Sequence, residues 1–255
     1  MSFIVFDIET QPLPDDVLRS MMPALPDADI LAPLDEFDLS SVKVGNLGPD
    51  KAAAKITAAR MEHDAAREQY PARLQAAKDQ QFSEFKSKAA LSATTGRVLC
   101  IGYYASDKDR VTIDQGGPDA NETKILATFW TFYASCRDKS TSLVGLNIHD
   151  FDLPFLVRRS WLNDVAVPAT VLRQDRYWDD VFVDLRKRWL CGQQASGQKS
   201  NFDFLGSAFG TGGKTEGVTG ADFARLWVED RAKAIEYLTN DLKQPAAWAR
   251  NMGVL

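Results

Sequence analysis

Two carboxylates, Asp7 and Glu9, are separated by a single residue at the end of an apolar run, FIVFDIE, over residues 3–9. The length and the β-rich composition of this run predict a buried strand. Side chains alternate across a strand, so both carboxylates are expected on the same face. Two anions held this close repel each other unless cations lie between them. The pair is therefore a candidate metal ligand, although acidic pairs at strand ends also occur without a metal.

A second polar cluster, NIHDFD, runs from Asn147 to Asp152 and contains His149 and Phe151. It follows a predicted strand at residues 142–147 and opens a predicted helix at residues 152–162. A carboxylate at this point would be held at a fixed angle by the helix. The same pattern is expected of a helix-capping Asp with Phe151 packed beneath it, so the cluster alone leaves both interpretations open.

A third motif, YLTND, places Tyr237 and Asp241 inside the last predicted helix. A spacing of four residues puts the phenol and the carboxylate on one face of a helix, where both can address the same point in space. An amphipathic helix with Tyr237 in the core would show the same spacing. Only the combination with the other two motifs favours a functional interpretation.

The three motifs occur in one order: D-x-E on a first strand, N-x-x-x-F-D after a central strand, and Y-x-x-x-D on a C-terminal helix. This order resembles the DEDD superfamily of 3′–5′ exonucleases in its tyrosine-containing branch. It is more closely similar to the stand-alone predicted exonucleases related to the proofreading domain of family B DNA polymerases. The resemblance covers residues 1–10 and about 96–252. It implies an α/β, RNase H-like fold, with a mixed β-sheet flanked by helices.

What the resemblance implies for the site is a set of four carboxylates that binds two divalent cations, Mg²⁺ or Mn²⁺: Asp7, Glu9, Asp152 and Asp241. Oxygen ligands of this kind suit both ions. Two such ions about 3.5–4 Å apart stabilise the attacking and the leaving oxygen of an in-line displacement at phosphorus. The resemblance also implies that the Tyr237 phenol orients the attacking water. Asn147 and Phe151 would support the site, the first by hydrogen bonding and the second by packing near the terminal base.

Two further residues could contact substrate. The sister branch of the superfamily uses a histidine five residues before the last Asp, but Glu236 stands there, so His149 is interpreted as a loop residue near the substrate groove. Residues 208–215, AFGTGGKT, approximate a phosphate-binding loop, but they follow a helical pattern where such a loop requires a strand. A mobile surface loop is the simpler interpretation, although Lys214 could meet a substrate phosphate.

The elements that must position these residues form an α/β pattern. Further strands are predicted at residues 97–105, 110–114 and 179–184, and further helices at residues 121–135, 201–209, 221–228 and 231–252. Strands dominate early and helices later. The pattern predicts a single domain over residues 1–255, built around one mixed sheet.

An insertion at residues 11–95 interrupts this pattern after the first strand. Prolines and aspartates crowd residues 11–50, which predicts an acidic loop without regular structure. Residues 51–90 are rich in alanine and contain no glycine, which favours helix. Pro71 is expected to split this stretch into a helical hairpin. The insertion is either a solvated helical insert or a surface that contacts substrate or a protein partner.

The composition excludes several classes of protein. The chain has 255 residues, of which 45% are hydrophobic and 25% charged, and this excludes disordered and fibrous proteins. No apolar run approaches the roughly 20 residues that span a bilayer, and the first residues reach acidic side chains too early for a secretory signal. A cytoplasmic protein without a membrane contact is expected. The net charge of −5 argues against a large electrostatic contact with duplex nucleic acid, but not against a small metal-assisted site.

The resulting hypothesis is a metal-dependent 3′–5′ exonuclease that releases nucleoside 5′-monophosphates from single-stranded or frayed 3′ ends. DNA is favoured over RNA, and a role in DNA repair, in proofreading in trans or in nucleic-acid turnover is expected. The first alternative is an exoribonuclease acting on RNA 3′ ends, since contacts to the 2′-hydroxyl decide between the sugars. The second alternative is a nucleic-acid-binding or assembly module on a nuclease fold.

Overall fold

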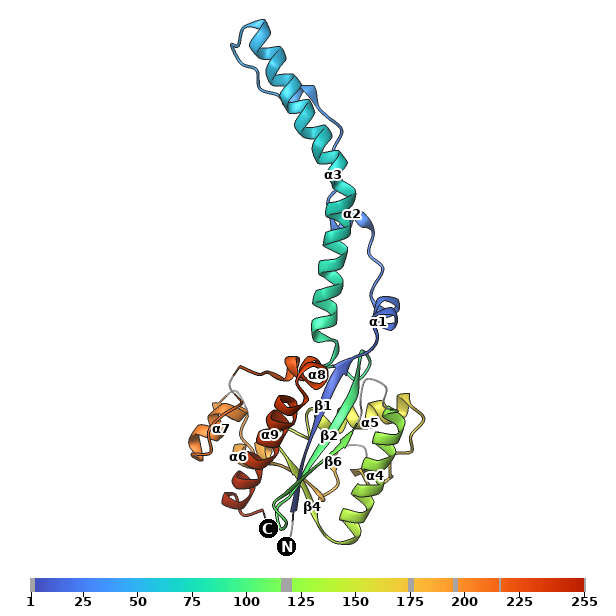
Figure 1. The fold of residues 1–255 in the computed structure, drawn as a ribbon, viewed down its shortest axis with the longest axis vertical. Coiled ribbons are helices and arrows are strands. Elements are labelled where there is room, and N and C mark those ends of the chain that lie inside the picture. Colours follow the sequence, from blue (N-terminus) through green and yellow to red (C-terminus); the bar gives the residue numbers. More distant parts are fainter. Residues whose placement is uncertain (1–2, 116–120, 174–176, 195–196, 216, 255) are drawn as a thin grey trace. The chain divides into compact units, whose positions relative to one another are not determined.

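The structure, a computed structural model, describes residues 3–115, 121–173, 177–194, 197–215 and 217–254 (Figure 1). The chain divides into two compact units. Unit 1 consists of Met1–Leu13 and Ala89–Leu255, and unit 2 consists of Pro14–Lys88. Unit 2 lies within the range 11–95 that the sequence marks as an insertion. Among the helices that the structure describes, none combines the length and apolar character that crossing a membrane requires.

Unit 1 is built on a mixed five-stranded sheet of order β3-β2-β1-β4-β7 (Figure 1). Its strands are β1 (Phe3–Pro12), β2 (Gly96–Ala105), β3 (Arg110–Gln115), β4 (Ser142–Gly145) and β7 (Phe182–Asp184). The pairs β1–β2 and β2–β3 are antiparallel, whereas β4 is parallel to both β1 and β7. The predicted α/β class is confirmed.

Strand β1 divides the core of unit 1 into two layers, because its side chains alternate between the faces of the sheet. Phe3 and Val5 pack in a cluster with residues of α8 (Gly220–Glu229) and α9 (Arg231–Asn251). Phe6 and Ile8 pack on the other face with α4 (Glu122–Asp138) and α5 (Asp152–Leu162). The alternation therefore places Asp7 and Glu9 on the face that α9 covers.

A β-bulge lies beside Glu9. Glu9 pairs with Cys100 across the sheet, but Thr10 pairs with Val98, so Leu99 is the extra residue of β2. Leu99 and Cys100 both belong to the α9-side cluster, whereas Val98 belongs to the other. Bulges increase the local twist and re-aim neighbouring side chains. This one lies where β1 carries its second carboxylate.

The predicted strands and helices of unit 1 are present, with bounds that differ by a few residues. The strand predicted at residues 179–184 is limited to Phe182–Asp184. Three elements were not predicted: the strands β5 (Leu172–Arg173) and β6 (Tyr177–Trp178), which pair with each other, and the helix α6 (Leu185–Leu190). The side chain of Asp184 caps α6 by accepting hydrogen bonds from the backbone of Arg186 and Lys187. Helix α7 (Phe202–Ala208) follows.

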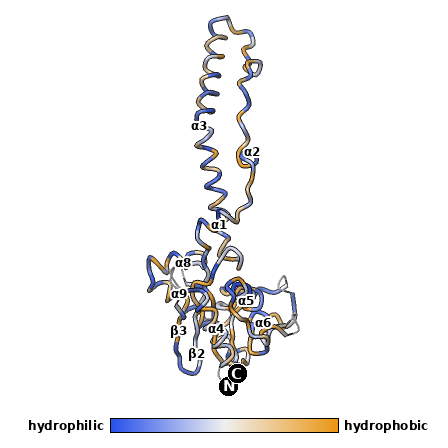
Figure 2. Tube along the Cα trace, turned by 90° about the vertical axis from the view of Figure 1, so that its right-hand side faces the viewer, coloured by the Kyte–Doolittle hydropathy of each residue, from blue (hydrophilic) through white to orange (hydrophobic). Residues whose placement is uncertain are grey.

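Unit 2 is a long helix, α3 (Pro49–Ala89), flanked by the segment of residues 15–43, which runs beside it in the opposite direction (Figure 2). The segment contains α1 (Asp15–Met21), α2 (Asp27–Ile30) and the 3₁₀ turn η1 (Leu39–Ser41). Contacts follow one another in antiparallel order. They are the ion pairs Asp15–Lys86 and Asp27–Lys78 and the hydrogen bonds of Tyr70 to the Leu31 carbonyl, His63 to Asp35 and Lys55 to Lys43.

Two predictions for the insertion are wrong. Residues 11–50 are not without regular structure, since they contain the short helices α1 and α2 and the turn η1. Residues 51–90 do not form a hairpin at Pro71, because α3 continues through this residue. An interior proline costs about 3 kcal/mol of helix stability. Contacts with the segment lie on both sides of Pro71, from Tyr70 and from Lys78.

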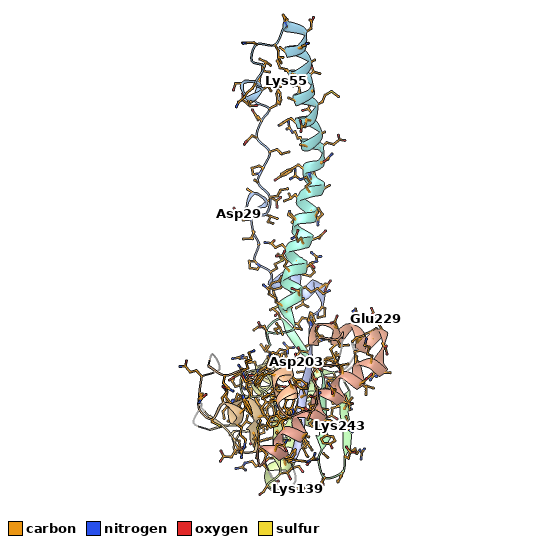
Figure 3. The ribbon with its side chains drawn as sticks, turned by 90° about the vertical axis from the view of Figure 1, so that its left-hand side faces the viewer. Asp29, Lys55, Lys139, Asp203, Glu229 and Lys243 are labelled. Atoms are coloured by element: carbon orange, nitrogen blue, oxygen red, sulfur yellow. The ribbon has the colours of Figure 1, made fainter. Side chains whose placement is uncertain are left out.

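Unit 2 has little core of its own. Leu18 and Phe82 are its buried apolar side chains among the residues described, and Arg19 lies over the Phe82 ring. Most of the other side chains project outward from the helix and the segment (Figure 3). Larger apolar residues of the unit are exposed: Val17, Met21, Leu25, Leu34, Leu39, Leu47 and Met61.

Candidate active site

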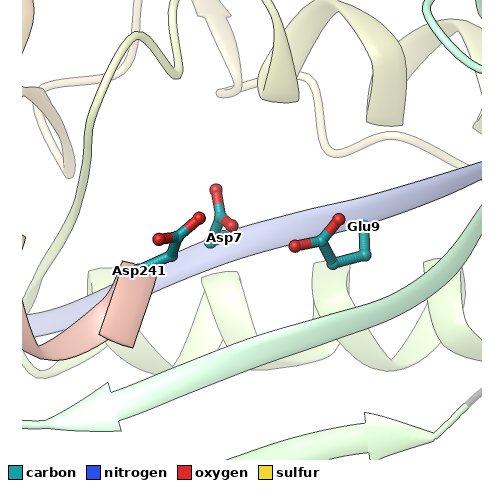
Figure 4. A group of neighbouring side chains, drawn as sticks. All are labelled: Asp7, Glu9 and Asp241. Atoms are coloured by element: carbon teal, nitrogen blue, oxygen red, sulfur yellow. The ribbon is translucent and has the colours of Figure 1, made fainter. Parts of the chain in front are cut away.

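Strand β1 and helix α9 bring three carboxylates together (Figure 4). One ligand oxygen from each of Asp7, Glu9 and Asp241 lies within 4.8 Å of the other two. Glu9 is buried, and Asp7 and Asp241 are half-buried. One oxygen of Asp241, Oδ1, is buried and has no hydrogen-bond partner in the described part of the chain. Three anions at this separation form an arrangement that a cation would stabilise.

Asp152 approaches the same place from the other side of β1. Strand β4 pairs with β1 only as far as Val5, so the edge of β1 beyond this residue is open. There the backbone N–H of Ile8 donates to Oδ1 of Asp152, at 3.2 Å. Asp152 is buried at the first turn of α5, and a helix N-terminus favours a negative charge. The fourth carboxylate is thus adjacent to the other three, although it is not one of the group within 4.8 Å.

Burial and mutual repulsion disfavour the ionised carboxylates. Burial, followed by the charges of Asp152, Glu9 and Asp241, holds the pKa of Asp7 well above its usual range. Burial raises the pKa of Asp152 to about 7, although the Ile8 N–H opposes the shift. Burial also raises the pKa of Asp241 to about 6, against the opposing charge of Lys214. Carboxylates that burial penalises in this way gain most from a bound cation.

A cavity of about 210 Å³ contains the side chains of Asp7, Glu9, Tyr237 and Asp241 and also reaches Lys214. Tyr237 is 1% exposed and packs against Phe223, with 5.9 Å between the ring centroids. Burial and the neighbouring carboxylates raise the pKa of the phenol far above 10. The phenol therefore keeps its proton and serves as a hydrogen-bonding group.

Lys214 is the cation of this cavity; the sequence suggested a substrate phosphate as its partner but did not predict its contact with Tyr237. Its Nζ donates to the hydroxyl of Tyr237, at 3.3 Å. The ammonium lowers the pKa of Asp7, Glu9 and Asp241, opposing the effect of burial. The only signal in the sequence was a lysine after two glycines, in a loop that was interpreted as mobile.

The loop that carries Lys214 is fixed at its backbone, contrary to that interpretation. The N–H of Lys214 donates to Oδ1 of Asp203, at 2.8 Å. The carbonyl of Gly213 accepts from Nε2 of Gln244 at 2.7 Å and from Nδ2 of Asn240 at 3.1 Å. Both amide side chains belong to α9, the helix of Tyr237 and Asp241. At Gly206, on α7, a Cβ atom would overlap the carbonyl oxygen of Gly212, so loop and helix are in close contact.

A larger cavity of about 780 Å³ adjoins the first and shares Leu146, Phe202 and Lys214 with it. Arg186 and Lys199 add two further cations to its lining, and the Asp203 carboxylate lies there too. Arg186 is held in place by donating to Oδ1 of Asn147, at 2.6 Å, and to Oγ of Ser200, at 3.1 Å. The cationic side chains make this cavity suitable for a polyanion.

The three remaining candidates do not line the cavity of Asp7, Glu9 and Asp241, although Phe151 directly precedes Asp152 in the chain. Asn147, with φ of 64°, lines the larger cavity, where it holds Arg186. Phe151 lines a separate cavity of about 280 Å³ with Phe155, Arg158 and residues 91–94. His149 is not among the residues that line these three cavities. Its ring lies 6.2 Å from that of Trp178, and burial lowers its pKa.

Comparisons with known proteins identify a family and a similar fold. Residues 89–243 match the model of a family described as "predicted 3′–5′ exonuclease related to the exonuclease domain of PolB". A family B DNA polymerase from the hyperthermophilic archaeon Pyrobaculum calidifontis is similar in structure, with a TM-score of 0.50 and 17% identity. The similarity covers 65% of this chain but 23% of the polymerase chain, and at this identity it concerns the fold alone. No curated protein matches.

Proposed function

Since the chain belongs to the family of predicted 3′–5′ exonucleases related to the exonuclease domain of PolB, we propose that it hydrolyses phosphodiester bonds at the 3′ end of single-stranded or frayed DNA and releases nucleoside 5′-monophosphates. The observation that carries this proposal is the convergence of Asp7, Glu9 and Asp241 within 4.8 Å of one another. Tyr237 and Lys214 lie in the same cavity. The proposal places the enzyme in the tyrosine branch of the DEDD superfamily.

The carboxylates fit a site for two divalent cations, Mg²⁺ or Mn²⁺. All the ligands offered are carboxylate oxygens, which these hard ions prefer. The buried Oδ1 of Asp241, which has no hydrogen-bond donor among the described residues, provides an unused ligand atom. Asp7, Glu9 and Asp241 would hold one ion, and Asp7 and Asp152 the second. Bound cations of this kind make water a stronger nucleophile and stabilise the charge that develops on the oxygens around phosphorus.

The residues of the chain would perform the remaining tasks. The protonated phenol of Tyr237 would orient the attacking water by a hydrogen bond. Lys214, which lies in both cavities, would bind a non-bridging oxygen of the scissile phosphate and keep the phenol in place. Fixed donors of this kind stabilise the transition state because they need no reorganisation when charge develops. The hydrogen bonds that hold the backbone of the Lys214 loop support this role.

The single-stranded DNA that leads to the scissile bond would occupy the larger cavity. Arg186, Lys199 and Lys214 provide three cations along it, and these suit successive phosphates of a single strand. Phe202 and Phe204 provide aromatic surface for a base in the same cavity. Asn147 would act indirectly here, by positioning Arg186. Phe151 and His149 would contact, at most, the end of the strand.

Unit 2 supports the additional proposal that the protein binds a protein partner. A unit of 75 residues, Pro14–Lys88, in which Leu18 and Phe82 are the buried apolar side chains described, leaves larger apolar residues exposed. Exposed apolar surface on an otherwise polar element is typical of protein contacts.

The proposed activity is tested with a 5′-labelled single-stranded DNA oligonucleotide, with Mg²⁺, with Mn²⁺ and with a chelator. Stepwise shortening that requires a metal is expected, and nucleoside 5′-monophosphates should be the products. An RNA oligonucleotide of the same sequence decides between the sugars. A closed circular single strand serves as the control, because it has no 3′ end. Cleavage of the circular DNA would contradict the proposal. So would a linear substrate that stays intact both with Mg²⁺ and with Mn²⁺.

A further inference from the structure

A cavity of about 360 Å³ lies at the outer corner of unit 1, on the face of the sheet opposite the carboxylates. It is bordered by β1, β2, the edge strand β3 and helix α4. It shares no residue with the carboxylate cavity or with the adjoining larger one. The proposed nuclease activity therefore gives it no role.

The floor of this corner cavity is formed by side chains on one face of the sheet. Ile4 of β1 pairs with Ala105 of β2, and Tyr103 of β2 lies two residues along on the same face. Phe132 of α4 forms the wall, with its ring edge-on to that of Tyr103 at 4.9 Å between centroids. Helix α4 covers Tyr103 but leaves Thr128 exposed at the rim. The space is wide enough for a large apolar side chain.

Tyr103 brings a hydroxyl group into this cavity beside the Asp114 carboxylate. The side chain is 7% exposed, and its hydroxyl is buried. Burial, and then the charge of Asp114 and a hydrogen bond with it, raise the pKa of the phenol, which keeps its proton. Because the hydroxyl is directed to Asp114, the apolar part of the cavity remains for a ligand side chain.

The rim of the cavity is cationic at one end. Lys108 and Arg110 line it, both are exposed, and neither has an ion pair within the part of the chain that the structure describes. Asp109, which lies between them, is engaged elsewhere, with the Tyr104 hydroxyl and with Lys243. Asp114 lies at the opposite end of β3. An acidic group of a ligand is therefore favoured at the end of the cavity where Lys108 and Arg110 lie, and not at the end where Asp114 lies.

Strand β3 is the outermost strand of the sheet, and within the described part of the chain no strand pairs with its outer edge. Such an edge accepts an extended peptide as an additional strand, while pockets beside it accept alternate side chains. We propose that this corner of unit 1 binds an extended acidic segment of a partner protein along β3, with one aromatic side chain in the cavity and a carboxylate against Lys108 and Arg110.

The test measures fluorescence anisotropy of a labelled peptide, EEVFVEE, with the full-length protein. Glutamates stand at both ends of the peptide so that either direction of the added strand brings carboxylates to Lys108 and Arg110. Saturable binding is expected, and the peptide EEVAVEE should bind about tenfold more weakly because it cannot fill the cavity. The peptide KKVFVKK should not bind. In hydrogen exchange, the amides of β3 should become protected when EEVFVEE is bound, because a new strand would cover the edge.

Two protein variants complete the design. The double change Lys108→Glu and Arg110→Glu should abolish binding of EEVFVEE and allow binding of KKVFVKK. Thr128→Trp should fill the cavity and weaken binding at least about tenfold, with unchanged nuclease activity as evidence of folding. Lys139→Glu, at the exposed end of α4, is the matched control and should bind like the wild type. No saturable binding of EEVFVEE, or binding that neither variant changes, would overturn the proposal.

Discussion

The ammonium of Lys214 lies 3.3 Å from the phenolic oxygen of Tyr237, and both groups line the cavity of the three clustered carboxylates. The Lys214 ammonium, which comes from a loop, is thus hydrogen-bonded to the Tyr237 phenol of α9 beside carboxylates that repel one another. A change in the charge of these carboxylates would therefore shift the ammonium and, with it, the phenol. Most of the expected behaviour of the site follows from this coupling.

Replacing Lys214 by methionine should lower the rate of strand shortening by about 10²–10³, the usual effect of removing one transition-state donor. It should also lower the metal concentration required, because the ammonium, which lowers the pKa of Asp7, Glu9 and Asp241, also repels a cation held by these carboxylates. Rates measured over a range of Mn²⁺ concentrations separate the two effects. Lys199→Met, in the adjoining cavity, should change substrate affinity but not the metal requirement. Equal behaviour of the two variants would contradict the role of Lys214.

Asp7→Asn should abolish shortening of the oligonucleotide but raise the melting temperature of the metal-free protein. The charges of Asp152, Glu9 and Asp241 all disfavour ionised Asp7, so a neutral amide of the same size relieves repulsion. Thermal denaturation with a chelator, and again with Mn²⁺, measures both effects. The metal should stabilise the wild type more than the variant. A variant that is less stable without metal would contradict this account of the cluster.

The stability of the metal-free protein should fall between about pH 4 and pH 7. Asp152 and Asp241 have pKa values raised to about 7 and about 6 from 3.8, so the folded state binds protons more tightly than the unfolded state. The stabilising effect of their protons is complete below the unfolded pKa and is lost as the pH rises through the folded values. Melting curves of the wild type and of Asp241→Asn should therefore diverge, with the wild type losing more stability with rising pH. Added Mg²⁺ should reduce the difference at pH 8.

Removing unit 2 should leave a folded nuclease. Pro12 pairs with Gly96, the Leu13 N–H donates to the Thr95 carbonyl, and Thr10 donates to the Ala90 carbonyl. The two chain ends of unit 1 are therefore neighbours, and a short glycine–serine linker can replace residues 14–88. The shortened protein should melt cooperatively and cleave single-stranded DNA at the wild-type rate. If it folds but has lost cleavage, unit 2 takes part in substrate binding.

The sequence predicts those parts of the site that depend on local geometry. Strand alternation is sufficient to place Asp7 and Glu9 on one face, and a helical spacing of four places Tyr237 and Asp241 on another. Their convergence, seen in the structure, was inferred from a family resemblance and not from the residues. The position of Asp152 against the Ile8 N–H depends on where β4 ends, which no local pattern shows.

The predictions that failed depend on tertiary contacts. Lys214 is placed by hydrogen bonds from side chains of α9 and by a carboxylate on α7, at distances of 11 to 31 residues along the chain. No turn signal in the sequence encodes these contacts. Pro71 was expected to end a helix because its intrinsic cost is high. The helix nevertheless continues through Pro71, and the antiparallel contacts of residues 15–43 with α3 lie on both sides of it. Intrinsic helix propensity contains no information about such contacts.

The close contact between Gly206 and the Gly212 carbonyl requires a residue without a side chain at position 206. A methyl group at position 206 would occupy the space of that oxygen and displace the loop. Every interaction of the Lys214 side chain would move with it, although residue 206 itself is not among those that line the cavity of the clustered acids. Substitutions of Gly206 are therefore expected to reduce the proposed activity as Lys214→Met does, and random mutagenesis should find them although the residue lies outside the cavity.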